Sequence, residues 1–188
     1  MHNRTTLANG LRVVTTSLPH TRSATVSLYV GAGSRYEADA EAGLSHFLEH
    51  MLFKGTQRRP TAREISEAIE CLGGTHNAAT DREVTLYYAK VPHGATSEAL
   101  DILCDMVRAP IMDGAELEKE RRVILEELAG VEDSPEELAA ILSDETLWPG
   151  QPLGRNIGGD PSSVRVLGLD AVNAYFGRQY VPGTSWSP

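Results

Sequence analysis

Residues His46, Glu49 and His50 have the types and the spacing of a zinc site. On a helix, side chains four positions apart lie one turn apart on the same face, so the two imidazoles can bind one metal ion. Glu49 directly precedes the second histidine, which gives the order H-x-x-E-H, the inverse of the commoner zinc-protease motif. A carboxylate there can take a proton from a metal-activated water. The pattern fixes only three positions, so two ordinary helix histidines beside the core are the alternative.

A catalytic zinc ion keeps three protein ligands and one open position, so a further ligand is required. The segment 113–131 is rich in glutamates, namely Glu116, Glu118, Glu120, Glu126 and Glu127. If this segment is a helix whose buried stripe centres on Ile124, Glu120 and Glu127 lie within about 60° of that stripe, and Glu126 lies on the far side. We therefore expect Glu127 as the ligand and Glu120 as a supporting carboxylate. A solvated acidic helix without a metal is the alternative.

Hydrophobic periodicity predicts the elements that must position these residues. Strands are expected at 11–17, 24–30, 75–79 and 84–91, and helices at 42–54, 61–72, 96–108, 113–131, 136–146 and 170–178. A short polar turn at 80–82 joins the last two strands, and residues 148–163 are expected to be loop. The strands precede and separate the helices without strict alternation. This order predicts an α+β fold, a mostly antiparallel sheet with helices packed on it.

Composition bounds the class of protein. The chain has 188 residues with 41% hydrophobic content, enough for one domain with a sizeable core. The net charge of −9 argues against nucleic-acid and anionic-membrane partners. No apolar run is long enough to span a membrane and the first residues lack a hydrophobic signal segment, so we expect a cytoplasmic protein. The two cysteines, Cys71 and Cys104, fall at apolar helical positions and are expected to be buried, reduced thiols.

Six stretches extend the pattern well beyond the motif. They read LANGLRVV (7–14), VGAGSRYE (30–37), GLSHFLEHMLFKGT (43–56), GGTHNAATDREVTLYYAKV (73–91), ERRVILEEL (120–128) and PLGRNIGG (152–159). On these stretches the chain resembles the pitrilysin-type inverzincin metallopeptidases, especially the mitochondrial processing peptidase branch and its bacterial relatives. The stretches follow the family's order, and the resemblance covers essentially the whole chain up to Pro182.

The resemblance implies a role for each candidate residue. It implies that His46, His50 and Glu127 bind Zn2+, that Glu49 is the general base, and that Glu120 is the family's further catalytic-site glutamate seven residues before the ligand. It also places Asn77 and Ala78 on an edge strand that pairs with an extended peptide substrate. A polar residue near a turn, without a substrate role, is the alternative for Asn77.

The resemblance also implies how the chain is organised. Residues 1–182 are expected to be an N-terminal zinc peptidase domain, and 183–188 a non-matching tail. Relatives continue after Pro182 into an apolar strand that completes the sheet and then into a second, similar domain. We therefore expect a domain that lacks its last strand and has a second homologous domain or subunit as its partner.

These features predict a zinc-dependent endopeptidase domain that hydrolyses extended peptides and is incomplete without a second domain. Two other functions stay open. A catalytically inactive structural or partner subunit would have the same fold, although such subunits usually lose motif residues. A zinc-dependent small-molecule lyase, such as S-ribosylhomocysteine lyase, has an inverted motif but uses a cysteine as third ligand, for which Cys104 is the candidate.

Overall fold

The computed structural model describes residues 2–182, and the predicted non-matching tail, residues 183–188, lies outside the described residues. Within them the strands form an antiparallel hairpin and a separate antiparallel sheet with the order β3-β5-β4. The strands are β1 (His2–Thr6), β2 (Arg12–Thr16), β3 (Ser23–Val30), β4 (Thr75–Thr80) and β5 (Thr85–Pro92). Strand β4 is therefore an edge strand of the described sheet.

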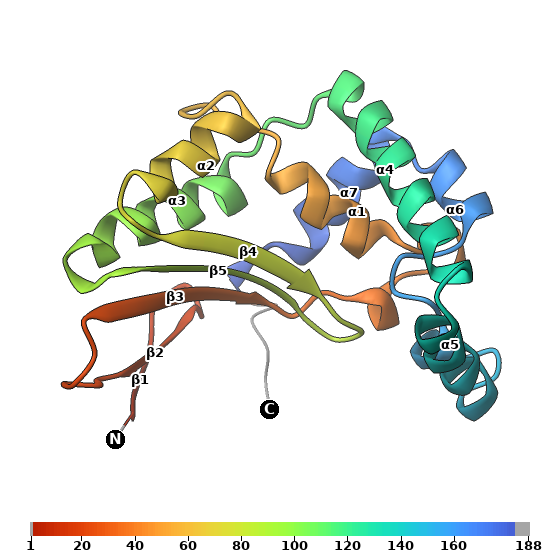
Figure 1. The fold of residues 1–188 in the computed structure, drawn as a ribbon, viewed down its shortest axis with the longest axis horizontal. Helices are drawn as coiled ribbons and strands as arrows, with labels where there is room; N and C mark the ends of the chain where they lie inside the picture. Colours follow the sequence, from red (N-terminus) through yellow and green to blue (C-terminus); the bar gives the residue numbers. More distant parts are fainter. Residues whose placement is uncertain (1, 183–188) are drawn as a thin grey trace.

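Helices α2 and α3 lie over one end of this sheet, and α1, α4 and α7 lie on the same side toward its other end (Figure 1). The bounds of the helices are α1 (Leu44–Leu52), α2 (Ala62–Glu70), α3 (Thr96–Arg108), α4 (Gly114–Glu132), α5 (Pro135–Leu147), α6 (Pro161–Val166) and α7 (Leu169–Gln179). The predicted α+β fold with an antiparallel sheet is confirmed. No helix within residues 2–182 is long and apolar enough to cross a membrane.

Strand β1 and helix α6 were not predicted. The prediction missed β1, which is exposed along its whole length and so carries no alternation of buried and exposed residues. The predicted loop at 148–163 contains a single 3-10 turn at Pro152–Gly154 and the start of α6. Helix α6 has only six residues, too few for a helical period to be visible in the sequence.

The core lies between the sheet and the helices. Strand β5 alternates between buried and more exposed residues, so that Tyr87, Ala89 and Val91 face the helices. Helix α1 adds its whole apolar face, and Phe47 and Met51 are completely buried. Most of the helix that carries the motif is thus fixed by packing, because a well-packed core leaves little room for rotation.

The prediction for α3 was wrong by one step of the helix. The spacing of apolar residues in this helix predicts that Leu100, Leu103, Cys104 and Val107 are buried. The buried apolar residues are instead Ala99, Ile102, Leu103 and Met106, and Leu100 is 44% exposed. Both stripes are apolar, so contact with β5 and β3 decides between them. The expectation of two buried thiols was also wrong. Cys104 is half-buried, and Cys71 is exposed at the end of α2.

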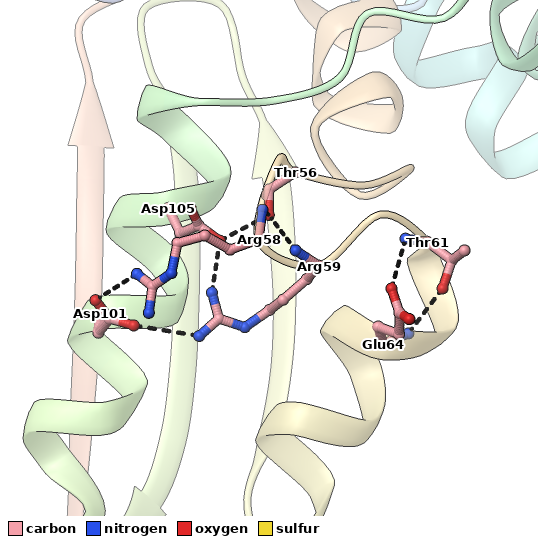
Figure 2. Close-up of polar contacts among 7 residues, drawn as sticks. All are labelled: Thr56, Arg58, Arg59, Thr61, Glu64, Asp101 and Asp105. Carbon is pink, nitrogen blue, oxygen red and sulfur yellow. Dashed lines mark hydrogen bonds and ion pairs between the residues drawn. The ribbon is translucent and has the colours of Figure 1, made fainter.

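A buried carboxylate fixes the loop that leaves α1. Asp105 of α3 is 7% exposed and accepts hydrogen bonds from the Thr56 hydroxyl, at 2.7 Å, and from the Arg59 guanidinium. Arg58 and Arg59 also pair with Asp101 one turn earlier (Figure 2). Because a buried charge is costly unless it is paired, these contacts hold the loop against α3 and limit the movement of α1.

Candidate metal centre

The start of α1 is fixed by groups outside the helix. Its N-cap residue, Gly43, has φ of 90° and offers no side chain. The buried Glu37 carboxylate takes over, accepting hydrogen bonds from the backbone N–H groups of Gly43, at 2.8 Å, and Ser45, at 2.6 Å. Burial raises the pKa of Glu37, and the two N–H groups oppose that rise. A carboxylate at a helix N-terminus also interacts favourably with the helix dipole.

Helices α1 and α4 bring three candidate ligands together. The Nε2 atoms of His46 and His50 lie 3.2 Å apart, and Glu127 Oε2 lies 3.8 Å from the first and 3.7 Å from the second. In the described part of the chain this is the one group of three or more His, Cys, Asp or Glu side chains with ligand atoms all within 4.8 Å. Ligand atoms at the corners of a tetrahedron around zinc stand about 3.3 Å apart. The donor set therefore fits zinc in both chemistry and spacing.

Glu120 sets the orientation of His50. Its carboxylate is almost fully buried, with one oxygen 3.0 Å from His50 Nδ1 and the other 2.7 Å from Lys54 Nζ. A carboxylate accepts a hydrogen bond from Nδ1–H, which leaves the lone pair of Nε2 directed at His46 and Glu127. The sequence predicted Glu120 as a supporting carboxylate. Lys54, in the loop after α1, was missed because its partner on α4 is distant in the sequence.

His46 is held as a neutral ring. Burial, and then the nearby charge of His50, lowers the pKa of His46 to about 4. Its Nδ1 atom is buried, without a hydrogen-bond partner among residues 2–182. A neutral imidazole with a free Nε2 lone pair is the form that binds a metal.

Glu49 lies in the same site and contacts the sheet. The Thr80 hydroxyl donates a hydrogen bond to its carboxylate at 2.5 Å. Burial raises the pKa of Glu49, the Thr80 contact opposes the rise, and the charge of Glu127 adds to it. The sequence prediction put Thr80 in a turn, whereas it is the last residue of β4. The alternation of His76, Ala78 and Thr80 toward one face could have indicated it.

The predicted substrate-binding residues lie on β4. Asn77 is exposed, Ala78 is half-buried, and the Ala78 N–H donates to the Asn77 side-chain oxygen at 2.9 Å. The structure thus places both on an edge strand that pairs with β5 and packs against α1, and Ala78 also packs against the hydrophobic core.

Most of the chain matches a known protein family. Residues 12–161 match the family model described as insulinase (peptidase family M16). The chain belongs to the M16 peptidase family. The family predicted from the six stretches is confirmed.

Two relatives show how much of an M16 protein the chain represents. It is 41% identical over 179 residues to an uncharacterized zinc protease of Streptomyces coelicolor, covering 95% of this chain and 39% of that protein. It is 42% identical over 176 residues to a probable mitochondrial-processing peptidase subunit beta of Arabidopsis thaliana, covering 94% of this chain and 33% of that protein. The chain thus spans less than half the length of these relatives.

Solved structures have the same fold. A protease from Helicobacter pylori superimposes with a TM-score of 0.93 at 25% identity, covering 98% of this chain and 44% of that chain. A peptidase M16 inactive domain from Pseudomonas fluorescens superimposes with a TM-score of 0.85 over 94% of this chain and 43% of that one, at 18% identity. The second likeness shows the fold alone.

Proposed function

We propose that this chain is a zinc-dependent endopeptidase domain whose metal ion is held by His46, His50 and Glu127. The convergence of these three side chains, within 4.8 Å of one another, carries the proposal. Glu120 supports it, because its buried carboxylate orients His50 from behind. The relatives named zinc proteases make zinc the metal of choice.

Glu49 is the proposed general base. Zinc bound at this position would lower the pKa of a water molecule and polarise the carbonyl of the scissile peptide bond. The Glu49 carboxylate would take the proton of the attacking water and deliver it to the leaving amine. Burial supports this role, because it raises the pKa of Glu49 and so brings the carboxyl closer to the range in which it both accepts and releases a proton.

The proposed substrate is an extended peptide. Strand β4 is an edge of the described sheet and its residue Thr80 contacts Glu49, so a peptide paired along this edge lies beside the site. Asn77 and Ala78 are the proposed binding residues on this edge. The Ala78 N–H now bonds the Asn77 side chain, and a peptide carbonyl would take over that donor.

A second homologous domain or subunit is the proposed partner. The chain covers 39% of one relative and 33% of another, so most of each related protein lies beyond this match. We expect the partner to contribute further groups that bind the peptide.

The two other functions have less support. The lyase alternative needs Cys104 as a ligand, but Cys104 lies on α3 and is not part of the ligand group found among the described residues. An inactive partner subunit has the same fold as an active one. The presence of both histidines, Glu49 and Glu127 favours an active domain.

Zinc content and peptide cleavage of the purified chain test the proposal. Glu127→Gln should lose bound zinc, whereas Glu126→Gln, its exposed neighbour on α4, should keep it. Glu49→Gln should keep zinc and lose cleavage, measured with and without a matching second domain. Retention of zinc by Glu127→Gln, with loss in Cys104→Ser, would support the lyase instead. Full cleavage by Glu49→Gln would refute the assigned base.

A further inference from the structure

Glu49 receives its hydrogen bonds from the sheet rather than from its own helix or from α4. Thr80 donates from its hydroxyl to Glu49 Oε2 at 2.5 Å, and the Thr80 backbone N–H bonds the same carboxylate. Within residues 2–182 both hydrogen bonds to this carboxylate come from Thr80. The strand places this side chain on the α1 side, because Thr80 shares its face of β4 with the half-buried His76 and Ala78.

A general base needs such a support. A glutamate has several rotatable bonds and keeps considerable rotamer freedom unless contacts fix it. Proton transfer requires the carboxylate to stay within hydrogen-bond reach of the reacting atoms. Glu49 also lies near the Glu127 carboxylate, whose like charge would push it away from the ligand group. The hydrogen bond from Thr80 stabilises the charged Glu49 carboxylate beside this like charge.

We propose that Thr80 is a positioning residue that holds Glu49 in the orientation for proton transfer. The inference rests on the proposed function. It extends that function, because Thr80 is the last residue of β4, the edge strand on which the peptide is proposed to bind. Pairing of β4 with β5 fixes Thr80 opposite Thr85. The Thr80 hydroxyl, through its hydrogen bond, then fixes the position of the Glu49 carboxylate.

Three variants separate this role from a merely structural tie between β4 and α1. Thr80→Val keeps the shape and the backbone N–H but lacks the hydroxyl, and Thr80→Ser restores the hydroxyl. Thr75→Val makes the same change on the exposed face of the same strand and serves as the matched control. Both residues are strand positions, where Val and Thr are both favourable.

The readout is binding of a peptide hydroxamate to the zinc-loaded full chain, measured by calorimetry. A hydroxamate occupies the open metal position and shares a proton with the base, so its affinity reports the position of Glu49 without requiring turnover. Thr80→Val should weaken hydroxamate binding about tenfold, the usual loss for one hydrogen bond to a charged group. Thr80→Ser and Thr75→Val should match the wild type. Zinc affinity should be equal in all of them.

Glu49→Gln separates failure of this inference from failure of the proposed function. Weak binding by Glu49→Gln combined with wild-type binding by Thr80→Val overturns the role of Thr80. The role of Thr80 is also overturned if the losses of affinity add up in the double variant Glu49→Gln/Thr80→Val. A residue that acts through Glu49 should cause no further loss once Glu49 is changed. If Glu49→Gln binds the hydroxamate as the wild type does, or the chain binds none even with a matching second domain present, the proposed function itself fails, and this inference with it. Should Thr80→Val not fold, Thr80→Ala removes the same hydroxyl.

Discussion

Glu120 lies behind His50, with a carboxylate oxygen 3.0 Å from its Nδ1 atom, and the two residues join α4 to α1. The other oxygen of the carboxylate faces Lys54, so the charge of Glu120 is paired although the side chain is almost fully buried. An outer partner of this kind fixes the ring orientation and the tautomer of a metal-binding histidine. Whether His50 is ready to bind a metal therefore depends on a residue from a different helix.

We expect Glu120→Gln to lower zinc affinity about 10- to 100-fold, the usual cost of losing a carboxylate behind a ligand histidine. The amide accepts a hydrogen bond from Nδ1–H but lacks the charge that increases the basicity of the ring. Competition with a chelating dye measures the affinity. Glu118→Gln, an exposed position on the same helix, is the control. Equal zinc affinity in Glu120→Gln and the wild type would contradict this role.

The sequence was most informative where a site depends on local geometry. His46 and His50 needed only one helix, and a four-residue spacing specifies their shared face. Glu127 needed a correct helical phase for α4. The apolar stripe that provides it is Leu117, Ile124, Leu128 and Val131, of which the first three are buried and Val131 is only half-buried. The metal-ligand group could thus be predicted from spacing and helical phase alone, although its role as a zinc site is still a proposal.

Residues whose partners are distant in the sequence could not be predicted in the same way. Glu37 caps α1 from a loop six residues before it, and Thr80 reaches Glu49 from the end of β4, where it pairs with Thr85 of β5. Lys54, in the loop after α1, pairs with Glu120 of α4, which is distant in the sequence. Leu100 shows the same limit, because two stripes of α3 are apolar and only the sheet selects one. Each error came from a contact between elements, which periodicity does not contain.

We expect Gly43→Ala to destabilise the chain more than Gly10→Ala does. Both glycines have nearly the same backbone, with φ of 90° and 88°, so both variants share the cost of a left-handed residue, about 1–2 kcal/mol. A Cβ at Gly43 would lie 2.5 Å from the Gly158 carbonyl oxygen, whereas a Cβ at Gly10 meets nothing within 4 Å. The difference between the two variants isolates this close contact.

Urea denaturation followed by circular dichroism measures both glycine variants. We expect Gly43→Ala to cost at least about 3 kcal/mol, in the range of overpacked or strained sites. Its zinc affinity should fall too, since the contact lies at the start of the helix that carries His46. An equal loss of stability in the two variants would show that the backbone conformation, and not the contact with Gly158, is what matters.

Asp105→Ala should destabilise the chain by about 3–5 kcal/mol, the cost of breaking a buried ion pair from one side. The substitution leaves the Arg59 guanidinium and the Thr56 hydroxyl without their buried acceptor. Asp101→Ala removes the exposed end of the same network and should change stability little, because solvent screens exposed pairs. Thermal unfolding of both variants checks this. Similar losses at the two positions would contradict the larger contribution of the buried carboxylate.

Alkaline pH should unfold the chain partly through a tyrosine pair. The hydroxyls of Tyr87 and Tyr180 lie 2.8 Å apart, and burial is the main cause that raises the pKa of both above 10. The unfolded chain therefore releases these protons more readily than the folded chain does. Their contribution to stability is complete below pH 10 and is lost as the pH rises above it.

Tyr87→Phe tests this source of the alkaline instability. The variant should lose about 1 kcal/mol at about pH 8, because the hydrogen bond to Tyr180 is gone. Above about pH 10 its free energy of unfolding should fall less steeply than that of the wild type, since one buried ionisable group has been removed. Urea titrations at a mildly alkaline pH and at several values above the ordinary tyrosine pKa give both quantities. Parallel slopes for the two proteins would mean that other groups control the alkaline transition and that Tyr87 stays protonated until the fold is already lost.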